Sequence, residues 1–316
     1  MKIVIPGGAG HVGQVLAAHF HGAGHSVTVL SRSPRSAPWQ TAAWDGRDLG
    51  DWRHILNGAD VVINLAGRSV NCRYHQRNRR EILESRVEAT AAIGRAIALA
   101  PRPPAVWMNA STATIYRHAL DRPMDESSGE LGGSEPGAPA TWRFSIAVAT
   151  SWERALFEAA TPQTRKIALR SAMTMSPESG GIFATLLGLV RTGLGGAAGS
   201  GEQFISWIHY LDFVRAIEHL MEHSEIEGAV NVCAPAPLPN REFMRILRKA
   251  WGARIGVPGP RLLLEFGAIL LRTETELILK SRRVVPGRLS AGGFVFQFPN
   301  WQEAAADLVR RAKAVC

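Results

Sequence analysis

The chain has 316 residues, of which 46% are hydrophobic and 20% charged, and its formal net charge is +9. This is the composition of a soluble globular protein, and its longest apolar run (262–271) contains Glu265 and is too short to span a membrane. The basic residues are dispersed and not interleaved with stacking aromatics, so we expect no nucleic-acid partner and no membrane partner.

The cysteines and the first residues bear on the compartment. Cys72, Cys233 and Cys316 lie far apart and form no CxxC pair, so neither a disulfide framework nor a metal site is expected. The N-terminal segment lacks the basic region and apolar run of a signal peptide. We therefore expect a cytoplasmic protein.

Apolar runs alternate with helical patterns through the first half of the chain. The runs predict strands at 2–6, 26–30, 59–67, 105–112 and 165–173, and the helical patterns lie at 13–24, 81–100 and 151–160. Alternating strands and helices indicate an α/β fold with a doubly wound parallel sheet of the Rossmann type.

Loop-rich segments from about residue 176 indicate a second, smaller region. We predict a nucleotide-binding domain over 1–175, to which 206–235 return. The segments 176–205 and 236–316 are predicted to form a smaller C-terminal substrate domain.

The stretch PGGAGHVG (6–13) lies between the first predicted strand and the first predicted helix. Its glycines have the spacing GxGxxG, which lets the backbone approach a pyrophosphate while the helix N-terminus offers N–H donors. The alternative is a tight turn without a ligand. We predict a dinucleotide site that includes Gly7, Gly10, His11, Val12 and Gly13.

The end of the second predicted strand bears on the choice of nucleotide. NAD enzymes place an acid there to bind the ribose hydroxyls. This chain has Ser31 at that position, followed by Arg32 and, nearby, Arg35. Because a serine and arginines favour a 2′-phosphate, we predict NADP(H); ordinary surface arginines are the alternative.

Several further motifs are shared with a known family. INLAG (63–67), ESRVEAT (84–90), NVCAPAPLPNREF (231–243) and VVPGRLSAGGFVFQFPN (284–300) resemble the extended short-chain dehydrogenase/reductase superfamily, in its epimerase-like branch with a C-terminal domain of unknown function. The resemblance covers essentially the whole chain. It implies a Rossmann domain and a smaller substrate domain with a cleft between them, and a nicotinamide side lined by Leu65, Ala66 and Gly67. It also implies that Ser85 and Arg86 are a pair of residues near the cofactor on the long helix.

The usual catalytic residues of that superfamily are incomplete in this chain. Its enzymes use a serine or threonine, a tyrosine and, four residues later, a lysine. Thr112 stands at the hydroxyl position, but Ser145 and Ala149 stand at the other two, and none of the five lysines follows a tyrosine at that spacing. The resemblance leaves Tyr116 and Glu126 as candidate acid/base groups, each with a structural role as the alternative.

Positive charge on the substrate side indicates an anionic substrate. Arg68 stands where the branch commonly has an acid. If residues 112–116 continue as a strand, Thr112 and Tyr116 point to one face and form a substrate-recognition cluster with Arg68. The resemblance adds Gln203 and Trp207 to the cleft, whereas the apolar neighbours of His209 favour a structural histidine.

These observations predict an NADP(H)-binding oxidoreductase or epimerase-like enzyme that acts on a small, anionic metabolite without the Tyr-x-x-x-Lys couple. An NADP-sensing or partner-binding protein without turnover is an alternative, as is a non-redox isomerase that uses the cleft. The sequence leaves open whether the chain forms a homodimer.

Overall fold

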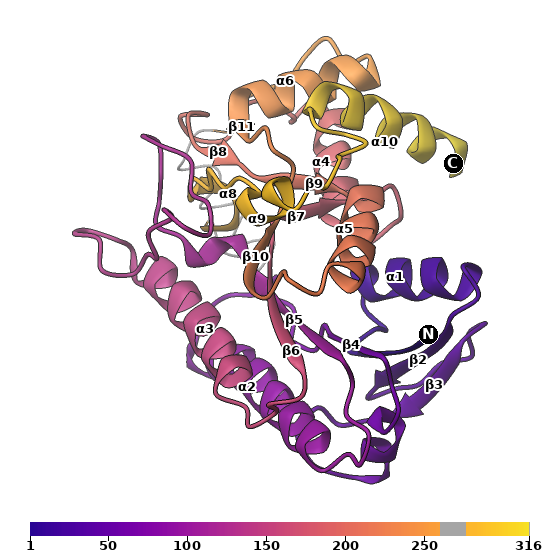
Figure 1. The fold of residues 1–316 in the computed structure, drawn as a ribbon. Helices are drawn as coiled ribbons and strands as arrows, with labels where there is room; N and C mark the ends of the chain where they lie inside the picture. Colours follow the sequence, from indigo (N-terminus) through magenta and orange to yellow (C-terminus); the bar gives the residue numbers. More distant parts are fainter. Residues whose placement is uncertain (260–275, 316) are drawn as a thin grey trace.

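A computed structural model of the chain describes residues 1–259 and 276–315. Its centre is a seven-stranded sheet in the order β10-β6-β5-β4-β1-β2-β3, in which every neighbouring pair is parallel (Figure 1). The strands are β1 (Lys2–Pro6), β2 (Ser26–Ser31), β3 (Gln40–Ala43), β4 (Val61–Asn64), β5 (Val106–Thr112), β6 (Arg165–Ser171) and β10 (Gly228–Val232).

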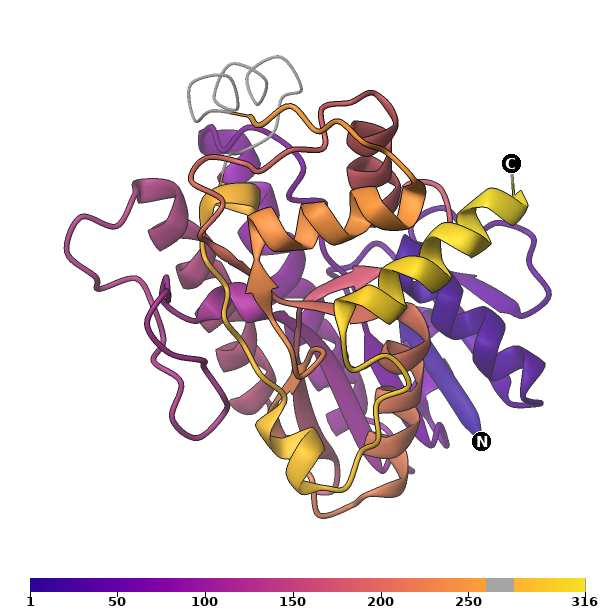
Figure 2. The same cartoon turned by 90° about the horizontal axis from the view of Figure 1, so that it is seen from above.

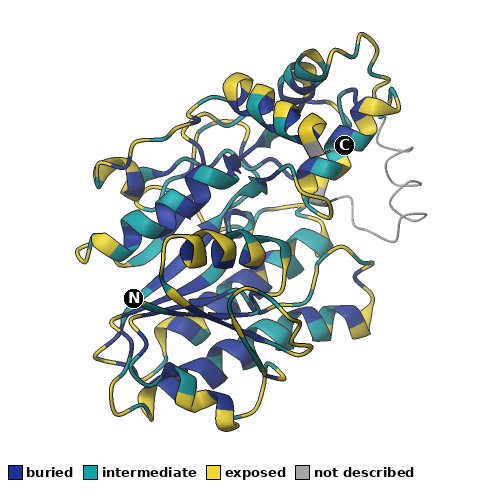
Figure 3. Cartoon of the chain, turned by 90° about the vertical axis from the view of Figure 1, so that its right-hand side faces the viewer, coloured by how far each residue is buried: buried dark blue, intermediate teal, exposed yellow. Residues whose placement is uncertain are grey.

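Helices cover both faces of this sheet because side chains alternate along each strand. Ile3 and Ile5 of β1 pack on one face with α1 (His11–Gly22) and α5 (Tyr210–Glu222). Val4 packs on the other face with α2 (Gln76–Ala98), α3 (Ala140–Phe157) and the short η1 (Asp51–Leu56). Figure 3 shows the strands buried between helices whose outer faces are exposed. The predicted doubly wound α/β fold is confirmed.

Two strands of the sheet were not predicted. β3 is a four-residue edge strand whose side chains are exposed or half-buried, so it carries no apolar run. β10 begins at a glycine and is only five residues long. The predicted strand at 165–173 divides into β6 and the short β7 (Met173–Met175), which leaves the sheet and pairs with β9 (Trp207–His209).

A second layer of structure covers the carboxyl ends of the strands (Figure 2). It is built around packed aromatic rings: Trp301 stacks on Phe243 at 3.9 Å and meets Trp207 edge-on at 5.0 Å, centroid to centroid. Its elements are α4 (Ile182–Arg191), β8 (Phe204–Ile205), β11 (Leu238–Pro239), α6 (Asn240–Trp251), α8 (Glu276–Leu279), α9 (Gly287–Ala291) and α10 (Trp301–Val315). Within the described residues, no helix is both long enough and apolar enough to cross a membrane.

One buried carboxylate fastens this layer to the sheet. Asp212 of α5 is fully buried, and its two oxygens accept the backbone N–H groups of Gln297 and Phe298, both at 2.8 Å. Arg215 donates to the same carboxylate at 3.0 Å. The segment that leads into α10 is thereby held against a helix that packs on the sheet.

We expect Asp212→Asn to lower the free energy of unfolding by about 1–3 kcal/mol, because the new amide group presents N–H to a backbone N–H that needs an acceptor. Urea unfolding measures the change. Glu222→Gln, an exposed substitution on the same helix, should stay within about 0.5 kcal/mol of wild type. Equal stability of both variants would contradict this account of the anchor.

Candidate functional site

A groove of about 980 Å³ runs along the glycine loop at the carboxyl ends of β1, β2 and β4. We call it the loop groove. Of the predicted nucleotide-site residues, it is lined by Gly7, Gly10, Ser31, Arg32, Leu65, Ala66, Gly67 and Ser85. The carboxyl end of an open parallel sheet is where ligands bind in such folds.

The glycine loop is tight because side chains have no room in it. Gly7 has φ +75°, and a Cβ there would lie 2.5 Å from the backbone nitrogen of Ala66. A Cβ on Gly13 would lie 2.4 Å from Cα of Gly8, so the helix packs directly on the loop. Gly10 is the N-cap of α1 and no side chain caps that helix, which leaves its first turn open to an anion.

The remaining predicted residues of the loop lie less directly on the groove. Val12 packs against the core of the sheet, and the imidazole of His11 lies against Gly181, the N-cap of α4. Both stay in the first turn of α1, so they can reach a ligand through backbone N–H groups. Arg35 is exposed and does not line the groove.

Sequence reasoning missed three carboxylates in the loop groove, Asp45, Asp48 and Glu81. Asp45 accepts the backbone N–H groups of Arg47 at 2.9 Å and Asp48 at 3.1 Å. These hydrogen bonds lower the pKa of Asp45, chiefly the one from Arg47. Asp45 and Asp48 follow β3. Because the sequence pattern of β3 was too weak to predict a strand there, it gave no indication that these two residues lie in the groove.

A second space, of about 480 Å³, lies where the sheet meets the C-terminal layer. We call it the central cavity. Its walls come from the ends of β5 and β6, from α2 and α3, and from segments beyond residue 200. Residues of particular interest are Tyr74, Arg86, Thr112, Ser145, Ala149, Trp152, Phe204, Glu276, Lys280 and Arg282.

Arg86 stands between the two spaces. Its guanidinium lies 3.3 Å from the position of a Cβ on Gly67, which lines the loop groove, while Arg86 itself lines the central cavity. It donates to the carbonyl of Ile82 at 2.9 Å and lies 5.0 Å from the ring of Trp152. Burial lowers the pKa of Arg86 to about 10. The groove and the cavity therefore adjoin at this side chain.

Two further cations reach the central cavity from the C-terminal segment. Lys280 is 1% exposed, and its Nζ donates to the carbonyl of Thr114 at 2.7 Å. Nε of Arg282 donates to the hydroxyl of the same threonine at 2.9 Å. Burial, and then the charge of Arg282, lower the pKa of Lys280 to about 7, so its charge depends on pH near neutrality.

A set of hydroxyls and one carboxylate occupies another wall. Tyr74 is 7% exposed, and its ring meets Phe144 edge-on at 5.2 Å. Its hydroxyl is hydrogen-bonded to that of Ser145, and Ser145 donates to Glu276 Oε2 at 2.6 Å. Sequence reasoning missed Tyr74 because it lies in an arginine-rich stretch interpreted as a solvated surface; its signal was a single aromatic residue among polar ones.

Comparison with known proteins now assigns the chain. Residues 3–233 match the NAD dependent epimerase/dehydratase family, and residues 260–308 match a domain of unknown function, DUF1731. The chain belongs to the NAD dependent epimerase/dehydratase family. Human epimerase family protein SDR39U1 is 31% identical over 98% of this chain and 100% of the relative.

Solved structures of similar proteins share the fold. The crystal structure of human SDR39U1 (isoform 2) with NADPH has a TM-score of 0.85 and 30% identity, covering 98% of this chain and 99% of that one. A nucleoside-diphosphate sugar epimerase from Corynebacterium glutamicum has a TM-score of 0.76 and 25% identity, covering 98% of this chain and 58% of that one.

The structure contradicts the expected cluster of Arg68, Thr112 and Tyr116. Thr112 lines the central cavity, but the chain then turns through η2 (Ala113–Ile115), so the alternation of a strand does not continue to Tyr116. Tyr116 is 1% exposed and does not line the cavity. Arg68 lines the loop groove and pairs with Glu81, so it belongs to the other space.

Tyr116 instead belongs to a buried network. Its hydroxyl accepts from Arg170 at 2.8 Å and donates to Asn231 Oδ1 at 3.0 Å. Both oxygens of Glu153 accept from Arg170 at 2.8 Å, and Ser111 donates to Glu153 at 2.6 Å. Burial raises the pKa of Tyr116 despite the charge of Arg170. Tyr116 therefore has a structural role and does not line the central cavity.

The carboxylate of Glu126 also lies away from the central cavity. It accepts the backbone N–H groups of Asn231 at 2.7 Å and Arg288 at 3.2 Å, so it fastens its loop to β10 and α9. Burial raises the pKa of Glu126. The geometry gives no support to the expected catalytic position above the cleft.

Gln203 and Trp207 were expected in the cleft but point into the C-terminal layer. Gln203 donates to the carbonyls of Ala198 and Ile278, and Trp207 packs on Trp301. The residues between them, Phe204, Ile205 and Ser206, line the cavity instead. The segment 203–207 thus lies at the cavity as expected, but the two residues named for it were wrong, because other residues of the segment line the cavity.

The expectation of a structural histidine at position 209 is confirmed. Its Nδ1 accepts the N–H of Leu211 at the start of α5, and its Nε2 lies 3.2 Å from Asp307. Its ring stacks on Phe298 at 3.9 Å. Burial lowers the pKa of His209 to about 4, so the ring stays neutral at physiological pH.

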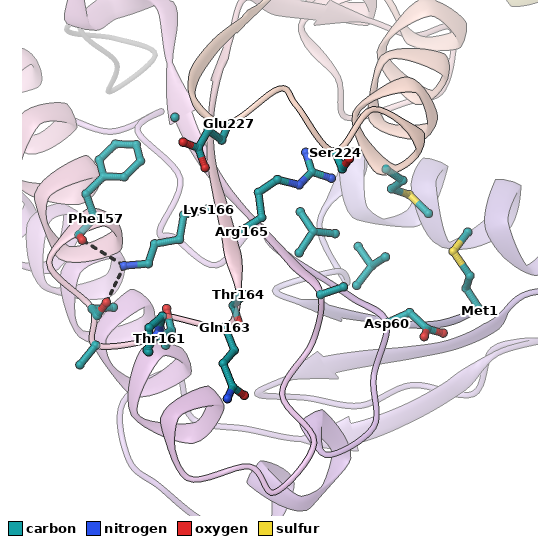
Figure 4. A pocket seen from close by; sticks show the side chains of 18 residues that line it. Met1, Asp60, Phe157, Thr161, Gln163, Thr164, Arg165, Lys166, Ser224 and Glu227 are labelled. Carbon is teal, nitrogen blue, oxygen red and sulfur yellow. Dashed lines mark hydrogen bonds between the residues drawn. The ribbon is translucent and has the colours of Figure 1, made fainter.

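A third hollow, of about 1190 Å³, lies at the opposite, amino ends of the strands (Figure 4). Its basic side chains donate hydrogen bonds to backbone carbonyls. Arg165 donates to Leu220, His223 and Ile226, and Lys166 donates to Phe157. We assign it no part in the site, since these contacts explain its polar groups and it lies away from the glycine loop.

We expect Tyr116→Phe to lower the free energy of unfolding by about 1–3 kcal/mol, because Arg170 and Asn231 each lose a buried partner. Urea unfolding measures this, and calorimetry should give an unchanged affinity for NADPH. Tyr210→Phe removes a half-buried hydroxyl that accepts from Arg311 and should cost less. A Tyr116→Phe protein of wild-type stability would contradict the structural role.

Proposed function

We propose that the chain is an NADP(H)-dependent oxidoreductase or epimerase-like enzyme that acts on a small anionic metabolite in the central cavity. The observation that carries the proposal is the arrangement of the two spaces: a dinucleotide-sized groove meets a cavity lined by three cations, and one of them, Arg86, stands at the junction.

The residues of the loop groove fit a dinucleotide. The strained, side-chain-free turn at Gly7 and the uncapped N-terminus of α1 suit a pyrophosphate. Human SDR39U1, which matches this chain over nearly its full length, was crystallised with NADPH. Bound NADP(H) would accept or supply a hydride at the end of the groove nearest the cavity.

The groove also supports a preference for the phosphorylated nucleotide. Ser31 and Arg32 line it at the end of β2, where an acid would repel a 2′-phosphate. Asp45 lies in the same groove, where two backbone N–H groups donate to its carboxylate and the basic residue Arg47 also lines the wall. Arg32 is exposed and can move toward the phosphate.

We expect NADPH to bind at least about tenfold more tightly than NADH, which corresponds to about 1.4 kcal/mol. Arg32→Ala should remove most of that preference, whereas Arg35→Ala, on the same loop but outside the groove, should not. Calorimetry with both nucleotides measures it. Equal wild-type affinities for NADPH and NADH would refute the assignment of the 2′-phosphate site.

The charge of the central cavity supports an anionic substrate. Among its described lining residues, Arg86, Lys280 and Arg282 are basic and Glu276 is the only acid. Apolar side chains make up much of the remaining wall, which strengthens charge interactions inside it. These three cations take the place that sequence reasoning gave to Arg68.

We expect Lys280→Met to weaken binding of malonate to the NADP⁺-saturated protein by about 1.5–3 kcal/mol, the contribution of a charge-assisted hydrogen bond. Because an anion binds the protonated amine, wild-type affinity should decrease as the pH rises above about 7. Calorimetry from pH 5.5 to about pH 9 measures both effects.

The matched control is Lys249→Met, which removes an exposed lysine from α6 and should leave malonate affinity unchanged. A wild-type affinity that is independent of pH, or that Lys280→Met does not alter, would show that the cavity does not hold an anion through this amine.

The absence of a Tyr-x-x-x-Lys couple favours one second candidate, an NADP-binding protein without turnover. Ser145 and Ala149, which the family resemblance places at the tyrosine and lysine positions, both line the central cavity. The cavity therefore has neither a tyrosine nor a lysine at these two positions. NADPH consumption with a panel of small keto acids distinguishes the two candidates.

A further inference from the structure

We propose that Tyr74 is the proton donor of the central cavity, reaching it from the start of α2, with Arg86 as the neighbouring cation that stabilises its phenolate. This inference rests on the proposed function, because it needs NADP(H) bound in the loop groove. It assigns a catalytic group to a chain that lacks the usual couple.

The position of the phenol is fixed from both ends. The backbone carbonyl of Tyr74 accepts from Nε of Arg79 at 2.7 Å, which holds the residue against the first turns of α2. Its ring packs edge-on against Phe144 of α3, and its hydroxyl contacts that of Ser145, one residue further along. The phenol therefore reaches from the loop before α2 to α3, and its hydroxyl lies beside Ser145, the residue that stands where the family resemblance places the tyrosine.

Of the three tyrosines in the chain, Tyr74 alone lines this cavity. The hydroxyl of Tyr116 is committed to Arg170 and Asn231, and Tyr210 accepts from Arg311 in the C-terminal layer. Lys280 also lines the cavity, but the proposed function assigns its amine to the anionic group of the substrate. Tyr74 is the phenol that a substrate in the cavity can meet.

The charged groups around the phenol come from four parts of the chain. Arg86 faces it from α2 and Glu276 from α8, while Cys72 lies on its own loop and Arg282 on the C-terminal segment. Burial, and then the charge of Glu276, raise the pKa of Tyr74 to about 12, whereas Arg86 and the hydroxyl of Ser145 act in the opposite direction. The resting phenol thus keeps its proton at neutral pH, as an acid must.

The step we infer is the reduction of a carbonyl to an alcohol. The carbonyl carbon gains a hydride from NADPH, its π electrons move to oxygen, and that oxygen takes the proton of Tyr74. NADPH becomes NADP⁺, and Tyr74 becomes a phenolate that the charge of Arg86 stabilises until water returns the proton. The reverse sequence oxidises an alcohol, with the phenolate as base.

The test uses ¹⁹F NMR on protein labelled with 3-fluorotyrosine, in which three tyrosines give three resonances. Tyr74→Phe assigns one of them. The pH titration is recorded on protein saturated with NADP⁺ and with NADPH. If the phenol lies beside the nicotinamide, the positive charge of its oxidised ring should make Tyr74 lose its proton at least about tenfold more readily with NADP⁺ than with NADPH.

Tyr116 and Tyr210 are internal controls and should titrate alike in both states. If Tyr74→Phe does not fold, Tyr116→Phe and Tyr210→Phe assign the remaining resonance by difference. A Tyr74 resonance that titrates identically with both nucleotides, on samples shown by calorimetry to be saturated, overturns this inference alone. Failure of either nucleotide to bind overturns the proposed function instead.

Discussion

The ion pair between Glu153 and Arg170 holds the site together. Both residues are less than 10% exposed, and a buried pair of this kind is stable only when its remaining hydrogen-bonding groups are satisfied. Arg170 also donates a hydrogen bond to the hydroxyl of Tyr116, and Glu153 also accepts one from Ser111. Although burial alone would lower the pKa of Arg170, the hydrogen bonds and charge of Glu153 raise it.

The same network reaches almost every part that frames the cavity. From Tyr116 it continues to Asn231 on β10, whose side-chain amide donates to the carbonyl of Val285 and whose backbone donates to Glu126. Helix α3, three strand ends, one loop and the C-terminal segment are therefore fixed to one another. Because these contacts are specific in distance and charge, they determine where the walls of the central cavity lie, and Tyr74 and Lys280 are part of those walls.

Sequence reasoning succeeded where the physics is local. The glycine loop, the end of β2 and the run INLAG depend on contiguous residues, so their spacing was sufficient to locate the loop groove. The cavity depends on contacts between residues such as Ser145 and Glu276, which are 131 positions apart. The prediction that Tyr116 faces the same side as Thr112 was wrong. The 3₁₀ turn after Thr112 interrupts the strand, so side chains no longer alternate there.

The late arrival of β10 has a consequence for biosynthesis. β6 ends at Ser171, but its outer neighbour in the sheet is completed only at Val232, and the cavity wall that contains Lys280 is made later still. While the ribosome makes the intervening residues, the nascent chain carries β6 with an unpaired edge, and such edges favour association with other chains. Its folding yield in the cell should therefore depend on how quickly residues 172–232 are translated, or on a chaperone that covers that edge meanwhile.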